Sequence, residues 1–433
     1  MTRAHNVRMQ SGRTPLLWSR PEFLKVWAAS SISAVGTQVT VLAVPLTAVL
    51  VFGAGPAETG VLTAAGVAPM LLLGLLAGAW VDRLPRRPVR IAADLASAMV
   101  IVTIPVASFL GVLRLEQLYV VAFLAGCCAV FARIAVTAML PALVGRQNLL
   151  EANSMLITSF SVSQIIGPSL AGVLVQIMSP PLALLADVAS FLISGVGFLR
   201  VRVSEPPAPS VARPGIRHEI LEGLLWLRQE PILFRLTVSI GLANLAWYGV
   251  QAVVVVFATE ELGLSPAMLG ISLAAIGPTS LVGALVSARM ARHLGLGPTL
   301  VISLTGEALS RVLLLVAGGP PLVAAITIGL SQALFGFIAP LWDVNSNSLR
   351  QTATPERLLG RVSAASSFVG VGMSPIGALL AGWIGQVAGT RIALLEATLV
   401  TLIAVLVLVW SPVPRLRDPA SAAQRPSPRS QEA

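Results

Sequence analysis

Charged residues are scarce in this sequence, and their scarcity excludes an ordinary water-soluble protein. Asp, Glu, Lys and Arg make up 11% of the 433 residues, whereas a soluble globular domain carries about 25%. Hydrophobic residues make up 55%, which is more than a chain of this length can bury away from water. The composition therefore predicts that much of the protein surface faces lipid.

Catalytic and metal-binding residue types are also few, which argues against an enzyme. Lys25 is the single lysine and no glycine precedes it, so the Gly-Lys pair of a phosphate-binding loop is absent. His5, His218 and His293 lie outside the apolar runs or at their edges, so neither a zinc site nor a Ser-His-Asp arrangement can form within those runs. The two cysteines are adjacent and cannot form an ordinary disulfide. We expect no catalysis, no cofactor and no metal.

Long hydrophobic runs are abundant, and they predict an all-α membrane protein. Each run continues for about 20 residues or more without the alternating polar positions of a membrane β-barrel. Gly, Pro and Arg clusters separate the runs. The expected spans are residues 23–52, 57–81, 88–112, 115–144, 150–178, 182–202, 232–259, 265–290, 297–318, 321–349, 359–388 and 391–411.

The basic residues predict the orientation of these spans. Of the 29 Lys and Arg residues, 25 lie on one side of the predicted spans, whereas the other side holds only Arg114 and Arg391. Arg133 and Arg311 lie within spans. Since cytoplasmic loops are enriched in basic residues, we expect a multi-pass plasma-membrane protein with both termini in the cytoplasm. The formal charge of +10 belongs to no soluble domain, so we expect no nucleic-acid partner.

A repeat of about 210 residues predicts five segments. "GPSLAGVLVQ" from Gly167 returns as "GALLAGWIGQ" from Gly377, and "GVLTAAGVAP" from Gly60 as "GISLAAIGP" from Gly270. "LLEANS" from Leu149 returns at an offset of 209. Duplicated six-helix bundles are a recurrent transporter architecture. We expect a tail over 1–22, a bundle over 23–202, a linker over 203–231, a second bundle over 232–411 and a disordered tail over 412–433.

The linker divides into two parts. "SEPPAPSVARPG" is rich in proline, which predicts an irregular segment. "IRHEILEGLLWLRQE" places Ile216, Ile220, Leu224 and Leu227 on one face and predicts an amphipathic helix. Such a helix either lies on the inner membrane surface or is a solvated connection between the bundles.

The loop between spans 2 and 3 carries the most specific motif. Its sequence "GAWVDRLPRR" resembles G-x-x-x-D-R-x-G-R-K/R of the major facilitator superfamily, with Pro85 in place of the family's second glycine. The segments "LPALVGRQNLLEANSM" and "LRQTATPERLLGRVSAA" resemble the drug-exporter branch that includes macrolide-efflux and enterobactin-exporter-like proteins. The resemblance implies two pseudo-symmetric six-helix bundles, with helices 1, 4, 7 and 10 around a central cavity. It also implies that the motif latches one conformation through Gly78, Asp82, Arg83, Arg86 and Arg87, although a topology-setting charge cluster is the alternative.

Charged residues within spans are costly, so each is a candidate functional group. Arg133 and Asp343 are separated by 210 residues and are predicted to pair when an inner gate closes; two separately satisfied charges are the alternative. A carboxyl group in apolar surroundings readily takes up a proton, because burial disfavours its charged form. The candidates for proton coupling are Asp94, Glu307, Asp187 and Glu396.

Simpler roles remain open for those four carboxyl groups. Asp94 could pair with the arginines of the loop motif or lie at the interface. Glu307 and Arg311 are spaced i, i+4, which predicts an ion pair within one helix. Asp187 and Glu396 fall in helices that are peripheral in the resembling family, so a packing role is open to both.

Polar and aromatic residues within the central helices predict a cavity for a bulky amphipathic ligand. The same side chains could instead join helices by hydrogen bonds. We also expect Gly167, Pro168, Gly377 and Gly382 to let helices 5 and 11 approach their neighbours. The candidate cavity residues are Thr37, Gln38, Gln164, Asn244, Trp247, Tyr248, Gln251, Gln332 and Phe335.

The sequence thus predicts a monomeric secondary transporter. We expect it to export hydrophobic or amphipathic small molecules by proton antiport, with two bundles that rock about a central site. A dedicated exporter of one metabolite or siderophore is the first alternative. A membrane sensor or scaffold that transports nothing is the second, and the loop motif argues against it.

Overall fold

The computed structural model describes residues 17–81, 83–203 and 216–418. Within those ranges the chain is almost entirely helical, and no β-strand occurs there. Twelve helical stretches are long and apolar enough to cross a membrane. The prediction of an all-α protein with twelve membrane helices is confirmed.

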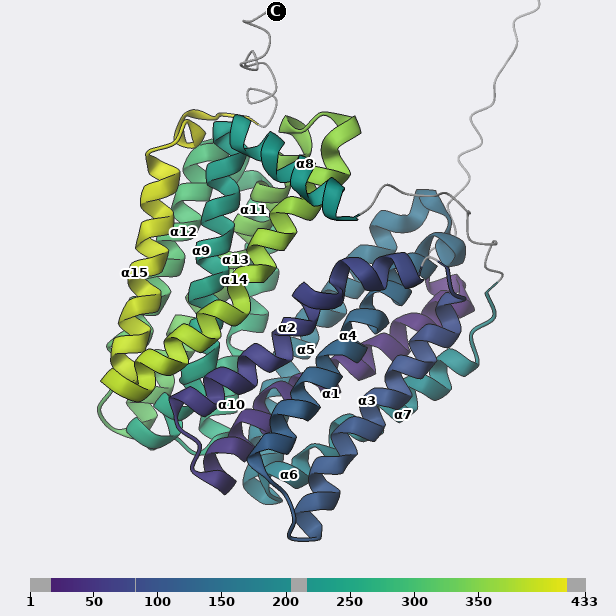
Figure 1. Ribbon diagram of the computed structural model, residues 1–433, viewed down its shortest axis with the longest axis vertical. Helices are drawn as coiled ribbons and strands as arrows, with labels where there is room; N and C mark the ends of the chain where they lie inside the picture. The colour runs from purple at the N-terminus through teal and green to yellow at the C-terminus, as the bar shows by residue number, and fades with distance from the viewer. Residues whose placement is uncertain (1–16, 82, 204–215, 419–433) are drawn as a thin grey trace, which may run out of the picture.

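The first six membrane helices pack side by side as one bundle (Figure 1). Helix α6 continues into α7 as the sixth span. The helices are α1 (Pro21–Phe52), α2 (Pro56–Val81), α3 (Arg86–Phe109), α4 (Leu115–Val144), α5 (Leu149–Ile177), α6 (Pro180–Ala183) and α7 (Leu185–Leu199).

The last six form a second bundle beside it, preceded by the linker helix α8 (Ile216–Gln229). Helix α9 ends in a π-helical turn, Phe257–Glu261, and α10 continues into α11 as one span. The helices are α9 (Pro231–Val256), α10 (Pro266–Ala274), α11 (Ile276–Leu294), α12 (Leu296–Leu315), α13 (Pro321–Ala353), α14 (Leu359–Ala388) and α15 (Thr390–Val409).

Proline and glycine set many of the helix ends. Pro21 and Pro231 occupy the first turn of α1 and α9, where a missing N–H breaks no helical hydrogen bond. Gly53 ends α1 with φ 63°; its N–H donates to the carbonyl of Val49, and the N–H of Ala54 donates to that of Ala48. This left-handed conformation strains any residue that has a Cβ.

Five of the six corresponding spans start 210 residues apart in the two halves, and the fourth spans, which start at Leu115 and Pro321, are 206 apart. "LLEANS" therefore aligns through Leu149 with Leu359, one residue later than the sequence match at 209 indicates. The spacing of the helix starts supports the repeat independently of the sequence matches, because it does not depend on which residues match. The pairs of starts are Pro21 and Pro231, Pro56 and Pro266, Arg86 and Leu296, Leu149 and Leu359, and Pro180 and Thr390.

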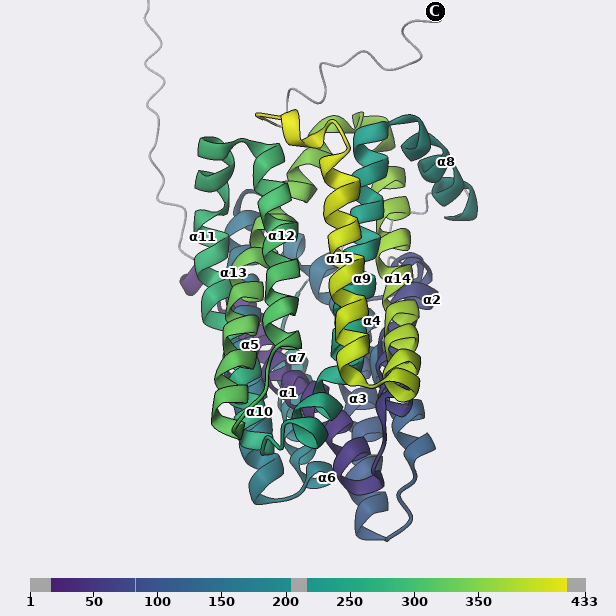
Figure 2. The same ribbon diagram turned by 90° about the vertical axis from the view of Figure 1, so that its left-hand side faces the viewer.

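The two ends of the molecule differ in how the bundles meet. We call the end at which α1 begins and α15 ends the termini face, and the other end the far face. Toward the far face one apolar cluster runs through both bundles and includes Leu46, Phe191, Val250 and Leu394. Toward the termini face the buried clusters are separate, one in the second bundle and two in the first. Figures 1 and 2 show the bundles in contact low in the view, and Figure 1 shows them diverging toward the termini face.

Short segments outside the spans also pack against the bundles. Leu17 is fully buried in a cluster with Leu140, although the sequence places it in the N-terminal tail. The N–H groups of Leu296 and Gly297 donate to carbonyls of residues 417 and 416, at 3.1 and 2.9 Å. The chain is therefore packed through these residues of the predicted C-terminal tail. The remainder of both tails and the proline-rich part of the linker lie outside the described residues.

Candidate functional site

Two pairs of glycines bring the bundles into contact in the half of the molecule near the far face. A Cβ atom placed on Gly60 of α2 would lie 2.9 Å from Cα of Gly382 on α14. A Cβ atom placed on Gly270 of α10 would lie 3.0 Å from Cα of Gly172 on α5. Since Gly270 follows Gly60 by 210 residues, and Gly382 follows Gly172 by the same number, the two contacts are related by the repeat.

Two glutamine side chains join the bundles at the same end. Oε1 of Gln386 accepts from the N–H of Ala57 at 3.4 Å, and Oε1 of Gln176 accepts from the N–H of Ala267 at 3.3 Å. Ala57 and Ala267 lie in the first turns of α2 and α10, whose N–H groups have no partner within the helix. Each glutamine therefore caps a helix of the other bundle.

The glycines predicted to allow close approach do so. A Cβ atom on Gly167 would lie 3.3 Å from the carbonyl oxygen of Val35 and would overlap Gln38. A Cβ atom on Gly377 would overlap the carbonyl oxygen of Leu245, the repeat equivalent of Val35. The carbonyl of Pro168 lies against Gly270. The fifth and eleventh spans, α5 and α14, thus depend on small residues where they meet their neighbours.

The loop motif between α2 and α3 lies toward the termini face. Asp82 is outside the described residues, and Arg83 is exposed. A Cβ atom on Gly78 would meet no atom of the described chain within 4 Å. Arg87 donates through Nε to the carbonyl of Phe198 at 2.9 Å and through Nη2 to that of Leu199. It therefore caps the end of α7, a favourable place for a cation.

A small cavity of about 80 Å³ lies between the bundles. Five of the nine predicted cavity residues line it: Gln38, Gln164, Trp247, Gln251 and Gln332. Nε2 of Gln38 donates to Oε1 of Gln164 at 2.9 Å, which joins α1 to α5. The structure thus brings amide groups from four helices to one place.

The lining differs from the prediction in two ways. No residue of α4 lines the cavity, whereas Leu273 of α10 and Ile276 of α11 do. These two belong to span 8, for which the resemblance implied no role here. The lining also includes Pro168, which the sequence singled out only for close helix approach, and apolar residues of α1 and α9 that it did not single out, namely Val41, Leu42, Pro45, Val254 and Val255.

The other four predicted residues lie outside this lining. Phe335 stacks on Trp247 with ring centroids 4.2 Å apart and planes at 9°, so it supports a lining residue from behind. Nδ2 of Asn244 donates to the carbonyl of Ile240 at 3.0 Å. Tyr248 packs against the apolar cluster shared by the bundles, and Thr37 is half-buried on α1.

Arg133 and Asp343 are both exposed and do not form an ion pair with each other. Nη2 of Arg133 contacts Sδ of Met70. No cation of the described residues lies within 4.0 Å of the Asp343 carboxylate. The predicted pair of Arg133 and Asp343 is therefore not formed in this conformation, and its role as a gate stays a prediction.

Asp94 forms a buried ion pair within its own helix. Oδ1 lies 3.0 Å from Nη2 of Arg90, and Oδ2 accepts from Ser194 of α7 at 2.8 Å. Nη2 of Arg90 also donates to Ser33 of α1 at 3.4 Å, and its guanidinium lies 4.9 Å from the ring centroid of Phe198. Asp94 thus joins three helices, and its partner Arg90 lies one turn earlier in the same helix.

The predicted ion pair in span 9 is present. Nη1 of Arg311 lies 3.2 Å from Oε2 of Glu307, and each residue is 4% exposed. Nε and Nη2 of Arg311 have no hydrogen-bond partner among the described residues. The pair satisfies the charge of Glu307 within one helix.

Asp187 and Glu396 have different surroundings, although the sequence places them at nearly equivalent positions. Asp187 is fully buried and accepts hydrogen bonds from Thr40 of α1 and from Ser190, the latter at 2.9 Å. Both carboxyl oxygens of Glu396 are buried with no hydrogen-bond partner in the described chain. Oε2 of Glu396 lies 3.9 Å from a Cβ placed on Gly249 of α9.

The family follows from a sequence comparison. The model of the Major Facilitator Superfamily matches residues 26–365 and 236–431. The chain belongs to the major facilitator superfamily. Members of this superfamily are transporters, so the expectation of a small-molecule transporter rather than an enzyme is confirmed. It is a multi-pass membrane protein.

Curated relatives within the superfamily include exporters. The multidrug efflux pump Tap of Mycolicibacterium fortuitum is 29% identical over 407 residues, which cover 92% of this chain and 97% of the relative. The enterobactin exporter EntS of Salmonella choleraesuis is 28% identical over 376 residues, which cover 86% of this chain and 87% of the relative. The resemblance to this exporter branch is thereby confirmed.

Solved structures support the major facilitator fold. A bacterial homologue of the iron transporter ferroportin, described as inward-facing, matches with a TM-score of 0.68 and 18% identity, over 90% of this chain and 98% of that chain. A bacterial homologue of the human lysosomal transporter Spinster matches with a TM-score of 0.66 and 14% identity, over 91% and 96%. Two pseudo-symmetric six-helix bundles are the shared fold.

Proposed function

We propose that this superfamily member is a secondary transporter that exports hydrophobic or amphipathic small molecules. One observation carries the proposal: the bundles meet near the far face through two repeat-related glycine contacts, whereas their cores are separate near the termini face. A pair of bundles that rocks about these contacts opens the central site to one side at a time, which is alternating access. The 25 basic residues on the termini side of the spans support its placement in the cytoplasm, so this conformation faces inward.

The substrate site in this proposal lies at the cavity between the bundles. Trp247 offers an aromatic face, and Gln38, Gln251 and Gln332 offer amide groups for a few hydrogen bonds. Its volume of about 80 Å³ is below the roughly 300–1,000 Å³ of pockets for drug-sized ligands. We therefore assign it to the inner end of the site, with the rest of the ligand lying toward the diverging halves of the bundles.

Proton antiport is the proposed driving reaction, with Asp187 as the carrier. Its carboxylate accepts from Thr40, two residues from Gln38 of the cavity, so a change in its protonation acts directly on α1. Burial without a cationic partner favours the neutral form of a carboxyl group. Asp94 and Glu307 are less suited because each already has an arginine partner. Glu396 remains the second candidate, since its oxygens are buried without partners.

The loop motif and the gate pair are assigned to the opposite conformation. Gly78 faces open space here, so it has room to receive α14 when the cytoplasmic halves close. In that state we expect Arg133 and Asp343 to approach each other, and the segment with Asp82, Arg83, Arg86 and Arg87 to hold the closed end.

The test is the accumulation of a panel of drugs and dyes in cells with and without the protein, repeated after a protonophore. We expect the protein to lower retention of several amphipathic compounds and the protonophore to abolish the difference. If no compound changes, drug export is wrong, and if export survives collapse of the proton gradient, antiport is wrong.

Export of one siderophore or metabolite is the second candidate, and the similarity to enterobactin exporters favours it. The same cells distinguish the two, because a dedicated exporter leaves the whole drug panel unchanged but releases its one substrate into the medium. Everted vesicles that take up neither kind of compound would leave a sensor or scaffold as the remaining role.

A further inference from the structure

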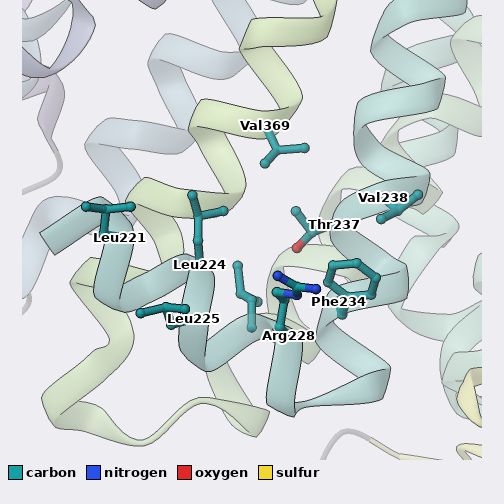
Figure 3. A pocket seen from close by; sticks show the side chains of 9 residues that line it. Leu221, Leu224, Leu225, Arg228, Phe234, Thr237, Val238 and Val369 are labelled. Carbon is teal, nitrogen blue, oxygen red and sulfur yellow. The ribbon is translucent and has the colours of Figure 1, made fainter. Parts of the chain in front are cut away.

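A second cavity, of about 370 Å³, lies between α8, α9 and α14 and has no described residue of the first bundle in its lining (Figure 3). It is apolar except for two side chains, Arg228 and Thr237. The remaining lining residues are Leu221, Leu224, Leu225, Leu227, Phe234, Val238 and Val369.

The linker helix α8 is held against α14 by one of its faces. Glu222 forms an ion pair with Arg361 of α14. A Cβ atom on Gly223 would overlap the carbonyl oxygen of Arg361, and Leu227 is 2% exposed. The position of α8, and with it one wall of the cavity, is therefore set by packing.

The opposite face of α8 leaves a wide apolar rim around the cavity. Leu221 is 59% exposed and Leu225 is 60% exposed, and Phe234 at the start of α9 is 42% exposed. This much apolar surface in one place marks a binding or membrane-contact surface. Since α9 and α14 are membrane helices, the rim lies where lipid reaches the protein.

Arg228 supplies the only cation among the described side chains that line the cavity. Figure 3 shows its guanidinium turned into the cavity beside Phe234 and Thr237. The hydroxyl of Thr237 is already hydrogen-bonded to Ser366 at 3.0 Å. Within the described ranges no acidic side chain lies within 4.0 Å of Arg228.

We propose that this cavity binds an anionic phospholipid, with the phosphate on Arg228 and an acyl chain along the leucines and Phe234. A guanidinium donates two parallel hydrogen bonds to phosphate oxygens. A cation beside an apolar channel is therefore complementary to a phospholipid, whose anionic headgroup is joined to apolar acyl chains. The bound lipid bridges α8 and α14, so it ties the linker helix to the second bundle. The site is separate from the proposed transport cavity.

The experiment uses the full chain in nanodiscs of phosphatidylcholine that contain a small fraction of spin-labelled phosphatidylglycerol. The measured quantity is the immobilised fraction of the labelled lipid. Arg228→Gln removes the charge and keeps a similar length. Arg357→Gln is the matched control, because Arg357 is also exposed near the termini face but does not line the cavity. Leu225→Trp fills the apolar channel and leaves the charge.

We expect Arg228→Gln to lower the relative affinity for labelled phosphatidylglycerol about fivefold and Arg357→Gln to leave it unchanged. Leu225→Trp should also lower the relative affinity for labelled phosphatidylglycerol. Labelled phosphatidylcholine should be immobilised to the same extent by the unmodified protein and by every variant. Equal losses in Arg228→Gln and Arg357→Gln would overturn the proposal. Equal binding of both lipids to the unmodified protein would overturn it as well. These readouts need no transport, so they are independent of the proposed function.

Discussion

The backbone N–H of Ala267 in the second bundle donates to Oε1 of Gln176 in the first, at 3.3 Å. Its repeat equivalent joins Ala57 to Gln386 at 3.4 Å, in the reverse direction between the bundles. In both bonds a glutamine side chain of one bundle accepts from a backbone N–H group in the first turn of a membrane helix of the other bundle. They can exist only while the bundles are closed at the far face.

Replacing these glutamines should therefore shift the protein toward the conformation open at the far face. We expect Gln176→Leu or Gln386→Leu to change the equilibrium about two- to twelvefold, since a neutral hydrogen bond contributes about 0.5–1.5 kcal/mol. The double variant should approach the product of the two. The measurement is thiol labelling from the far face of a cysteine at position 251, with Cys127 and Cys128 replaced by serine. Gln176→Glu keeps the acceptor oxygen and is the control; equal labelling of all variants would show that the bonds do not hold the far face closed.

A larger side chain at Gly60 should act in the same direction and more strongly. In Gly60→Leu the added atoms meet Cα of Gly382 at close range, and overpacking typically costs about 1–3 kcal/mol. We expect labelling of the same cysteine from the far face to rise about tenfold or more. Gly66→Ala on the same helix is the matched control, because its Cβ meets no described atom within 4 Å. A variant that still labels only from the termini face would count against α2 and α14 as the closing contact.

Charge exchange tests the gate pair. Arg133→Asp alone places two acidic groups on helices that approach each other in the closed state, so we expect transport to be lost. Arg133→Asp combined with Asp343→Arg should restore part of the activity, measured as dye efflux from loaded cells at equal expression. Complete absence of rescue, with the double variant correctly inserted, would mean that the two residues act separately.

Breaking the buried pair in α12 should destabilise the protein. Glu307→Leu leaves Arg311 buried without its partner, which typically costs about 3–5 kcal/mol, and the loss should appear as a lower melting temperature in detergent. Glu307→Leu with Arg311→Leu should recover most of it. Glu22→Gln, which breaks the more exposed pair with Lys25, should change stability by about 0–1 kcal/mol. If the double variant is stable but no longer exports dye, the pair has a role in transport beyond packing.

Neutralising Asp187 should separate export from the proton gradient. Asp187→Asn can still accept from Thr40 but cannot exchange a proton, so we expect energised export to fall to the level seen with a protonophore, while the protein stays folded. Glu396→Gln is the comparison at the other candidate carboxyl group. Unchanged gradient-driven export in Asp187→Asn, with loss in Glu396→Gln, would transfer the assignment to Glu396.

The sequence predicted the fold because its signals are local. A run of apolar residues ends at Pro, Gly or Arg whatever surrounds it, and the Glu307–Arg311 pair follows from helical spacing alone. The same local reasoning missed the pair of Arg90 with Asp94, although both residues fall in the predicted span 88–112 at the i, i+4 spacing. A search for i, i+4 partners of every buried carboxyl group would have found it.

The candidate site was predicted only in part. Gln38, Gln164, Trp247, Gln251 and Gln332 line the cavity, but span 8 takes the place expected of span 4. Apolar residues that face lipid and those that line a cavity are chemically alike, since lipid is as apolar as a protein core. The rotation and tilt of each helix decide whether a residue faces lipid or the cavity, and the sequence of a single helix determines neither.

By itself the sequence determined the number of spans, the duplicated halves and the position of the loop motif, because hydropathy and repeat spacing are properties of the chain. Only the tertiary structure decided which residues meet across the duplication. Nothing in the sequence distinguishes Gln176 and Gln386 from other glutamines, and they acquire a role only because packing brings a backbone N–H group of the other bundle to each. In the sequence Asp187 is one of several carboxyl groups within spans, and only the structure shows that Thr40 donates to it. Such contacts depend on how the helices of a bundle pack.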